Sequence, residues 1–218
     1  PEYRKGEILL GLDGSQFCAH SPNGDGNGVA EPLSEHLRRV ADCAGMFAAA
    51  FDAEEQARAA GLLHDLGKYA DQFQRRVRGC GERGRDHWTV GALAALTAGP
   101  FGLFPALAIA GHHTGLDKLR GDLNLAGRYW LDAFKQTPER FTTIDRKALF
   151  ARFDADGFVR PHIESGRRPT GHTAADMLDL RMIFSALVDA DFLETEAHFA
   201  GDAQTPRRPR PSGPELDV

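Results

Sequence analysis

The segment Gly61-Leu62-Leu63-His64-Asp65-Leu66-Gly67-Lys68 decides both the fold and the chemistry that this sequence predicts. Its adjacent histidine and aspartate supply imidazole and carboxylate, which are good ligands for divalent metals of the first transition row. A helical pattern leads into the segment, and Gly67 is typical of a helix end. We therefore expect a metal-binding pair at the point where a helix gives way to a loop.

Other histidines and a late aspartate lie at or near expected helix ends. Hydrolysis of a phosphoester by two cations that share a water needs about six or seven protein ligands. The chain offers one such set of candidates: His36, His64, Asp65, His87, His112, His113 and Asp191. Asp189 is the alternative to Asp191, but Asp191 continues the apolar helical face that precedes it. The set predicts a metal-dependent phosphoester hydrolase.

Each histidine also has a simpler interpretation, because a single histidine on a helix is usually a satisfied core or surface residue. The adjacent His112 and His113 would then be exposed loop residues. Two imidazoles after an apolar helix would, if buried, leave ring nitrogens without partners, which favours ligands. Four further histidines lie in turn-like or terminal contexts, and we expect them on the surface, outside the centre: His20, His162, His172 and His198.

Composition limits the possible functions. A chain of 218 residues can form one large domain, and 42% hydrophobic with 26% charged residues is ordinary for a soluble protein. The net charge of -5 gives no global attraction to nucleic acid, so a polyanion would need local basic patches or bound cations. Three separate cysteines without a CxxC pair favour a reducing cytoplasm. No apolar run approaches the ~20 residues of a membrane span, and we expect no membrane role.

Apolar spacing predicts a mainly helical fold without convincing strand ladders. We expect helices over 35–51, 56–66, 86–98, 106–112 and 173–191, with shorter ones over 129–136 and 146–153. Ser34 is a candidate N-cap, and Asp52 with Glu55 and Thr173 with Asp176 resemble capping boxes. The predicted domains are an irregular lead-in over 1–33, a catalytic domain over 34–199, and a flexible Pro/Arg-rich tail over 200–218.

The sequence resembles the HD nuclease domain of the CRISPR-associated helicase-nuclease of type I interference, and it is most similar to the type I-C form. The resemblance covers residues 17–199. It rests on an ordered series of segments: Ala19-His20-Ser21-Pro22-Asn23, Leu33-Ser34-Glu35-His36-Leu37, Gly61 to Lys68, Phe73-Gln74, Asp86-His87, Ala110-Gly111-His112-His113, and Phe184 to Glu196, which includes Asp191. It implies the helical bundle of an HD domain.

The resemblance also implies roles for the candidate residues. One metal would be held by His36, His64, Asp65 and the late aspartate, and the second by His87, His112 and His113, with Asp65 bridging. Asp65 and Lys68 would be the catalytic residues, with Lys68 contacting the scissile phosphate; a solvated lysine at a helix end is the alternative. The cofactors would be two divalent ions, with Mn, Ni, Co or Fe favoured and Mg or Zn possible.

The implied activity is cleavage of single-stranded DNA by attack of a metal-activated hydroxide. The implied partners are a helicase portion of the same protein or a separate helicase subunit, and the CRISPR RNA-guided surveillance complex. Arginines could guide the DNA backbone, although a solvated loop is the commoner role of such a run: Arg75, Arg76, Arg78, Arg83 and Arg85. Two alternatives remain, namely an HD phosphohydrolase of nucleotides or cyclic nucleotides, and a metal-stabilised docking module without catalysis.

Overall fold

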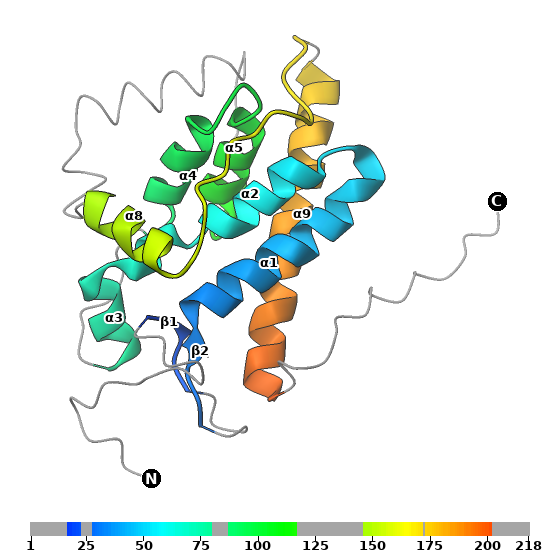
Figure 1. Cartoon of the computed structure of the whole chain (residues 1–218). Coiled ribbons are helices and arrows are strands. Elements are labelled where there is room, and N and C mark those ends of the chain that lie inside the picture. The colour runs from blue at the N-terminus through cyan, green and yellow to red at the C-terminus, as the bar shows by residue number, and fades with distance from the viewer. Residues whose placement is uncertain (1–16, 23–27, 80–86, 117–145, 172, 202–218) are drawn as a thin grey trace, which may run out of the picture.

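A computed structural model of the chain describes residues 17–22, 28–79, 87–116, 146–171 and 173–201. Helices dominate these residues, which confirms the predicted mainly helical bundle (Figure 1). The elements are β1 (Cys18–His20), β2 (Glu31–Pro32), α1 (Leu33–Ala48), η1 (Ala49–Phe51), α2 (Glu54–Leu63), η2 (Leu66–Tyr69), α3 (Asp71–Val77), α4 (Thr89–Leu96), α5 (Leu103–Gly111), α8 (Arg146–Ala155) and α9 (Thr173–Ala200).

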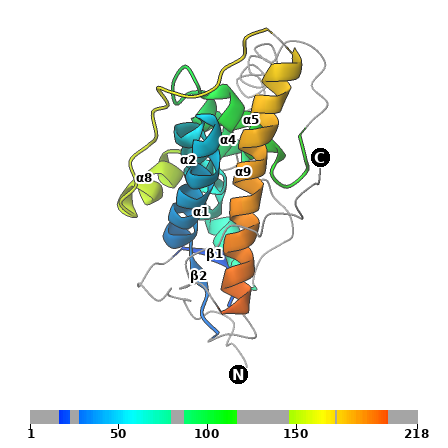
Figure 2. The ribbon, with the colours of Figure 1, turned by 90° about the vertical axis from the view of Figure 1, so that its right-hand side faces the viewer.

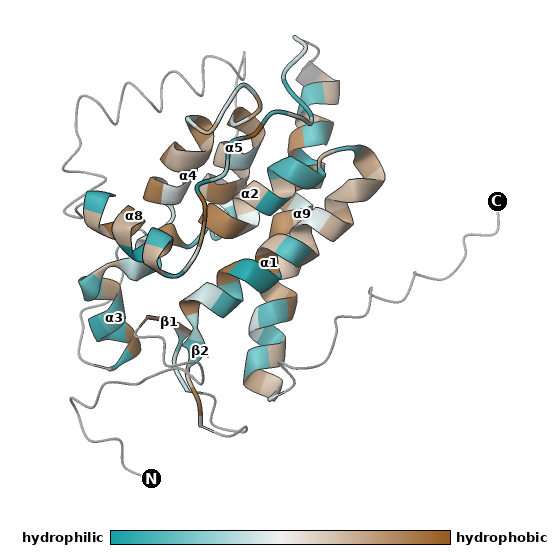
Figure 3. Cartoon of the chain, viewed as in Figure 1, coloured by the Kyte–Doolittle hydropathy of each residue, from teal (hydrophilic) through white to brown (hydrophobic). Residues whose placement is uncertain are grey.

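The bundle is built around the antiparallel pair α1 and α2, with the long α9 packed against both α1 and α5 (Figures 1 and 2). Helices α4 and α5 form a second pair. Their sequences are apolar on nearly all sides, so both helices must be largely buried. Helix α3 and the outer turns of α1 carry more hydrophilic residues than α4 and α5 do (Figure 3).

Close helix contact depends on small residues. A side-chain Cβ at Gly61 of α2 would lie 2.5 Å from the Cα of Ala41 in α1, and one at Gly91 of α4 would lie 1.8 Å from the carbonyl oxygen of Leu63. Only glycine permits these approaches, because backbone atoms cannot move aside. The two contacts fix the end of α2 between α1 and α4, and that end carries the His64-Asp65 pair.

The expectation of an irregular lead-in without strand pairing is wrong for its described part. Strands β1 and β2 form a two-stranded antiparallel sheet at the N-terminal end of α1 (Figure 1). Gln74 of α3 joins β1 to the turn after α2, because it accepts a hydrogen bond from Cys18 N and donates to the carbonyls of Cys18 and Lys68. Strands of two and three residues are too short to show an alternating pattern.

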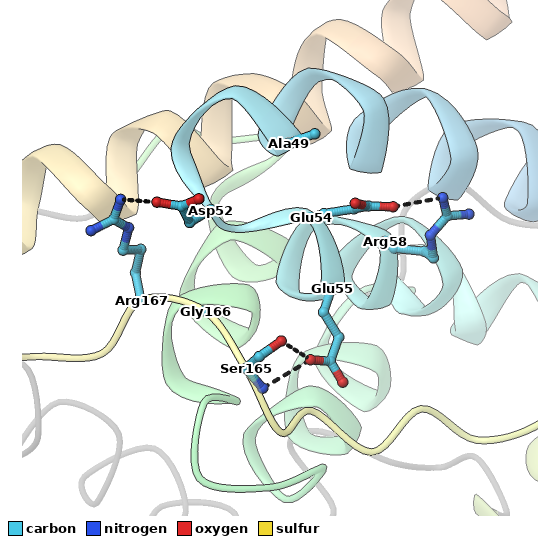
Figure 4. A pocket seen from close by; sticks show the side chains of 8 residues that line it. All are labelled: Ala49, Asp52, Glu54, Glu55, Arg58, Ser165, Gly166 and Arg167. Atoms are coloured by element: carbon cyan, nitrogen blue, oxygen red, sulfur yellow. Dashed lines mark hydrogen bonds and ion pairs between the residues drawn. The ribbon is translucent and has the colours of Figure 1, made fainter.

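Two expected helix caps are also wrong. Ser34 lies inside α1, whose N-cap is Pro32. Asp52 and Glu55 do not form a capping box, because the N-cap of α2 is Ala53 and makes no side-chain hydrogen bond. Asp52 pairs instead with Arg167, and the carboxylate of Glu55 accepts hydrogen bonds from the segment at residues 164–165 (Figure 4). These acids therefore hold a crossing segment in place.

The other predicted helices lie within a few residues of the observed ones, except that α9 continues past residue 191 to Ala200. Two local predictions also differ from the structure. His87 precedes α4 and is not in its first turn. Arg75 and Arg76 lie in α3 and are exposed there, so this part of the basic run is helical and not a loop. The helix predicted over 129–136 lies outside the described residues. No described helix combines the length and apolar character that crossing a bilayer requires.

At the start of α9, Asp176 accepts hydrogen bonds from the backbone N–H groups of Thr170 and Gly171, which precede the helix. The predicted capping box of this aspartate with Thr173 stays a prediction, because the partners that the structure gives it lie further upstream. The predicted stripe of α9 faces the core, where Leu180, Ile183 and Leu187 are completely buried. Asp191 follows on the same helix and reaches the site described next.

Candidate metal centre

The His64-Asp65 pair lies where α2 ends and η2 begins. His64 is the C-cap of α2, and its Nδ1–H donates to the carbonyl of Gly61 at 2.8 Å. The next turn is held to the segment before α4, because Gly67 N donates to the carbonyl of His87 at 2.9 Å. A Cβ at Gly67 would lie 2.4 Å from that same oxygen, so a glycine is required there. The sequence Asp-Leu-Gly thus brings His87 beside the pair.

A first group of ligand-type atoms comes from α1, α2, η2 and α9. His36 Nε2 lies 3.5 Å from Asp65 Oδ2 and 3.3 Å from Asp191 Oδ1. His64 Nε2 lies 3.2 Å and 3.6 Å from the same two oxygens. Two ligands of one ion, each bonded at roughly 2.1 Å, stand roughly 3.0–3.4 Å apart. The spacings therefore suit four ligands around one shared cation.

A second group of ligand-type atoms uses the other oxygen of Asp65. Asp65 Oδ1 lies 3.3 Å from His87 Nε2 and 4.0 Å from His112 Nε2. His87 Nε2 is 2.8 Å from His113 Nε2, so this fourth side chain points to the same place. His112 is the C-cap of α5 and donates its Nδ1–H to the carbonyl of Ile109 at 2.6 Å. Asp65 thus faces one histidine group with each oxygen.

The residues present fit divalent cations. Four buried atoms that face the centre have no hydrogen-bond partner among the described residues: Nε2 of His36, Nε2 of His64, Nε2 of His112 and Oδ1 of Asp65. An unsatisfied buried polar group costs about 1–3 kcal/mol, so a folded protein rarely gathers several in one place. Cations bound among imidazole and carboxylate ligands would satisfy all of them.

The pKa values of the histidines differ between the two groups. Burial alone would lower the pKa of His64, but the nearby carboxylates of Asp65 and Asp191 raise it to about 9. Burial and the nearby charge of His64 lower the pKa of His112 to about 3. Against burial, His64 and Lys68 hold the pKa of Asp65 well below its usual range. The first group therefore holds protons that a cation would replace, whereas His112 is already neutral.

Lys68 is part of the centre and not a solvated residue at a helix end, so that alternative is wrong. It is only 6% exposed, and its Nζ lies 2.6 Å from Asp65 Oδ2. Its ammonium also lies 5.5 Å from the ring centre of Phe73. The lysine consequently places a positive charge on the oxygen that faces His36 and His64.

Comparison with known families agrees with this geometry. Residues 33–144, just over half of the chain, match the family model of the HD domain. This chain belongs to the HD domain family. The family implies a metal-dependent phosphohydrolase, and the two groups around Asp65 could hold the metal, as could a third group of His20, Glu31 and His36. No curated protein matches the chain.

The structure brings all seven predicted ligands of this HD domain together, and it separates Asp189 from them. Asp189 lines a hollow of about 220 Å³ between α9 and the end of α1, with Phe47, Met182 and Leu193. His162 is exposed, as expected, and His172 lies outside the described residues. A second hollow of about 630 Å³ lies at the turn between α1 and α2, near the opposite end of these helices from His36 and His64 (Figure 4).

Two residues of the site were not predicted from the sequence. His20 of β1 was expected on the surface, but its pKa is lowered chiefly by burial, and its Nδ1 lies 2.6 Å from Glu31 Oε2. Glu31 of β2 is 3% exposed and lies 3.3 Å from Nδ1 of His36. His198, also expected on the surface, is buried. The apolar residues before His20 were the available signal, because they favour a buried segment.

Proposed function

We propose that this HD domain is a metal-dependent nuclease that cuts single-stranded DNA in CRISPR type I interference. The ordered set of sequence segments that resembles type I-C nucleases supports this choice within the HD family. The observation that carries it is the position of Asp65, whose two oxygens face separate histidine groups. A carboxylate between two cation sites would place both cations where they can stabilise the attacking and leaving oxygens of an in-line displacement.

The protein's own residues would do most of the positioning. Two bound cations would lower the pKa of a shared water and stabilise the charge that develops on the phosphate. His64 and His112 are each oriented by a hydrogen bond from Nδ1 to a carbonyl of their own helix, which leaves Nε2 free to bind. Lys68 would bind a non-bridging phosphate oxygen once a cation neutralises Asp65.

The second group is the open side of the centre, and it is where a strand of DNA would approach. His113 is exposed, while His36 and His64 are fully buried. The ring of Phe73 lies 5.4 Å from that of His87, and the guanidinium of Arg76 lies 5.7 Å from Phe73. An exposed arginine beside an aromatic ring is the combination that binds single-stranded nucleic acid, with charge for the backbone and a face for a base.

The net charge of -5 fits a domain to which DNA is delivered. We propose a helicase, in the same protein or as a separate subunit, that supplies the displaced strand after an RNA-guided surveillance complex has opened the target. The domain would then need only local basic groups such as Arg76 and its bound cations to hold the strand.

The decisive experiment is cleavage of circular single-stranded DNA by metal-stripped protein resupplied with Mn, Ni, Co, Fe, Mg or Zn. We expect cutting with at least one ion, and loss of cutting in Asp65→Ala and His113→Ala. His162→Ala is the control, because this histidine is exposed outside the centre. Hydrolysis of nucleotides or cyclic nucleotides without DNA cutting would favour the alternative phosphohydrolase. No hydrolysis with any ion would favour a docking module.

A second experiment tests the path of the DNA. We expect Arg76→Ala to raise the KM for single-stranded DNA several-fold and to reduce its dependence on salt, with little change in kcat, because the residue binds backbone without touching the reacting atoms. Arg181→Ala, which removes an exposed arginine of α9, is the matched control. Equal effects of the two substitutions would contradict a specific path past Phe73.

A further inference from the structure

The three buried histidines of the centre are oriented in two different ways. His64 and His112 each cap the C-terminal end of a helix, and each donates Nδ1–H to the carbonyl three residues earlier. Carbonyls in the last turn of a helix have spare capacity to accept a hydrogen bond, and that of Ile109 also accepts the backbone N–H of His112. His36 lies in the first turn of α1, where the groups left without partners are N–H donors. It therefore needs an acceptor from outside its helix.

Glu31 of β2 places a carboxylate oxygen beside Nδ1 of His36, a nitrogen that has no hydrogen-bond partner among the described residues. Its Oε2 lies 3.3 Å from His36 Nδ1, on the side of the ring opposite to the Nε2 that faces Asp65 and Asp191. The carboxylate is almost completely buried, and its other oxygen, Oε1, has no hydrogen-bond partner among the described residues. A buried carboxylate with one oxygen unsatisfied is unfavourable for folding alone, which indicates that it is kept for its effect on His36.

His20 holds the carboxylate in place. Its Nδ1 lies 2.6 Å from the same Oε2, and its ring stands edge-on to the ring of His36, with centroids 5.1 Å apart. The other side of His20 stacks on His198 of α9, and His198 Nε2 lies 3.1 Å from the carbonyl of Ser21. The small sheet of β1 and β2 thus lies beside the centre and connects the start of α1 to the end of α9.

We propose that Glu31 and His20 are positioning residues of the metal centre: Glu31 accepts Nδ1–H of His36, so that Nε2 is presented to the cation of the first group, and His20 fixes Glu31. A carboxylate acceptor also makes the imidazole a stronger ligand than a carbonyl acceptor does. The first group consequently binds its cation more tightly than the second group. This proposal rests on the two-cation centre of the proposed function, but not on DNA as the substrate.

The test is titration of the metal-free protein with Mn²⁺, followed by calorimetry, without any nucleic acid. We expect two ions per chain with different affinities in the parent protein. Glu31→Ala is expected to weaken the tighter site about 10–100-fold and to change the weaker site little. Glu31→Gln keeps an acceptor oxygen and is expected to recover most of the loss. Glu35→Gln, which changes a partly exposed glutamate in the first turn of α1, is the control and is expected to bind both ions like the parent.

A second readout separates positioning from a general structural role. In the Zn²⁺-loaded protein, ¹⁵N chemical shifts of His36 are expected to show a protonated, hydrogen-bonded Nδ1 in the parent, a weaker Nδ1–H hydrogen bond in His20→Ala, and a loss of this hydrogen bond in Glu31→Ala. Parent-like affinities in Glu31→Ala, equal weakening of both sites, or a third ion per chain held by His20 and Glu31 would each overturn the proposal. Two bound ions without DNA cleavage would overturn only the nuclease function.

Discussion

Gly61→Ala is the substitution that tests how the bundle positions its ligands. Gly61 lies on α2 one turn before His64, at the crossing with α1. An added Cβ would lie 2.5 Å from Cα of Ala41, 2.7 Å from its N and 2.9 Å from the carbonyl carbon of Val40. All three are backbone atoms, so no side chain can rotate away. Normal contacts between such atoms are roughly 3.5–4.0 Å, and the two helices would have to separate by about 1 Å.

Two opposing effects set the size of the change. Alanine is more favourable than glycine in a helix interior by about 1 kcal/mol. Forcing a methyl group into a packed contact costs about 1–3 kcal/mol, and more where only backbone can move. We expect the packing term to dominate and the free energy of unfolding to fall by about 2 kcal/mol. For a chain of this length that corresponds to a Tm lower by about 4–8 °C.

The matched control is Gly45→Ala in α1. There the added Cβ would lie 3.4 Å from the guanidinium of Arg58, at the flexible end of a side chain. We expect the helix gain to remain, so that Tm is unchanged or up to about 4 °C higher. Both variants would be measured by calorimetry in the metal-free state and then titrated with Mn²⁺. Because His36 lies on α1 and His64 on α2, Gly61→Ala is also expected to weaken metal binding. A Gly61→Ala protein as stable as its parent would refute the reasoning.

Three further predictions concern stability and protons. Gln56→Leu is expected to lower the free energy of unfolding by about 2–4 kcal/mol in urea titrations, because Gln56 is buried and its amide bonds the backbone of both Phe101 and Arg167; a change below about 1 kcal/mol would contradict this. Tyr69→Phe removes a 2.7 Å hydrogen bond to Asp156 from a ring that stays buried, and the same assay is expected to show a loss of about 1–2 kcal/mol. Metal affinity is expected to rise with pH until about 9, because the raised pKa keeps His64 protonated below that value and a cation must displace the proton. Below that pH the charged His64 also stabilises the metal-free fold, and this stabilisation is lost as the pH rises through about 9. Calorimetry in buffers of different ionisation enthalpy would count the protons that metal binding releases. Binding at pH 7 without release of a proton would contradict a protonated His64.

Much of the fold could be predicted because its strongest signals are local. The apolar stripe of α9 and the almost wholly apolar α5 leave few alternatives to buried helices. The ligand candidates could be found for a related reason, since histidines at the ends of apolar helices have few satisfactory buried partners. His112 caps the apolar α5 in the structure, and His64 caps the buried end of the amphipathic α2.

The remaining features depend on contacts between distant segments. Asp52 and Glu55 have the spacing of a capping box, but their partners are Arg167 and the backbone at Ser165, more than a hundred residues away. The role of Glu31 depends equally on where β2 places it relative to α1. A local pattern shows what a side chain can do within one turn of helix, and it contains no information about a competing partner from another element.

The position of the centre follows from the physics of helix ends. A buried histidine is a useful ligand only when one ring nitrogen is anchored and the other is free, and the last turn of a helix provides that anchor without any further residue. His64 and His112 use this arrangement, whereas His36, at the opposite kind of helix end, requires Glu31. His36 is therefore the ligand that its own helix cannot orient, and its contact with Glu31 connects the β1–β2 sheet to the metal centre.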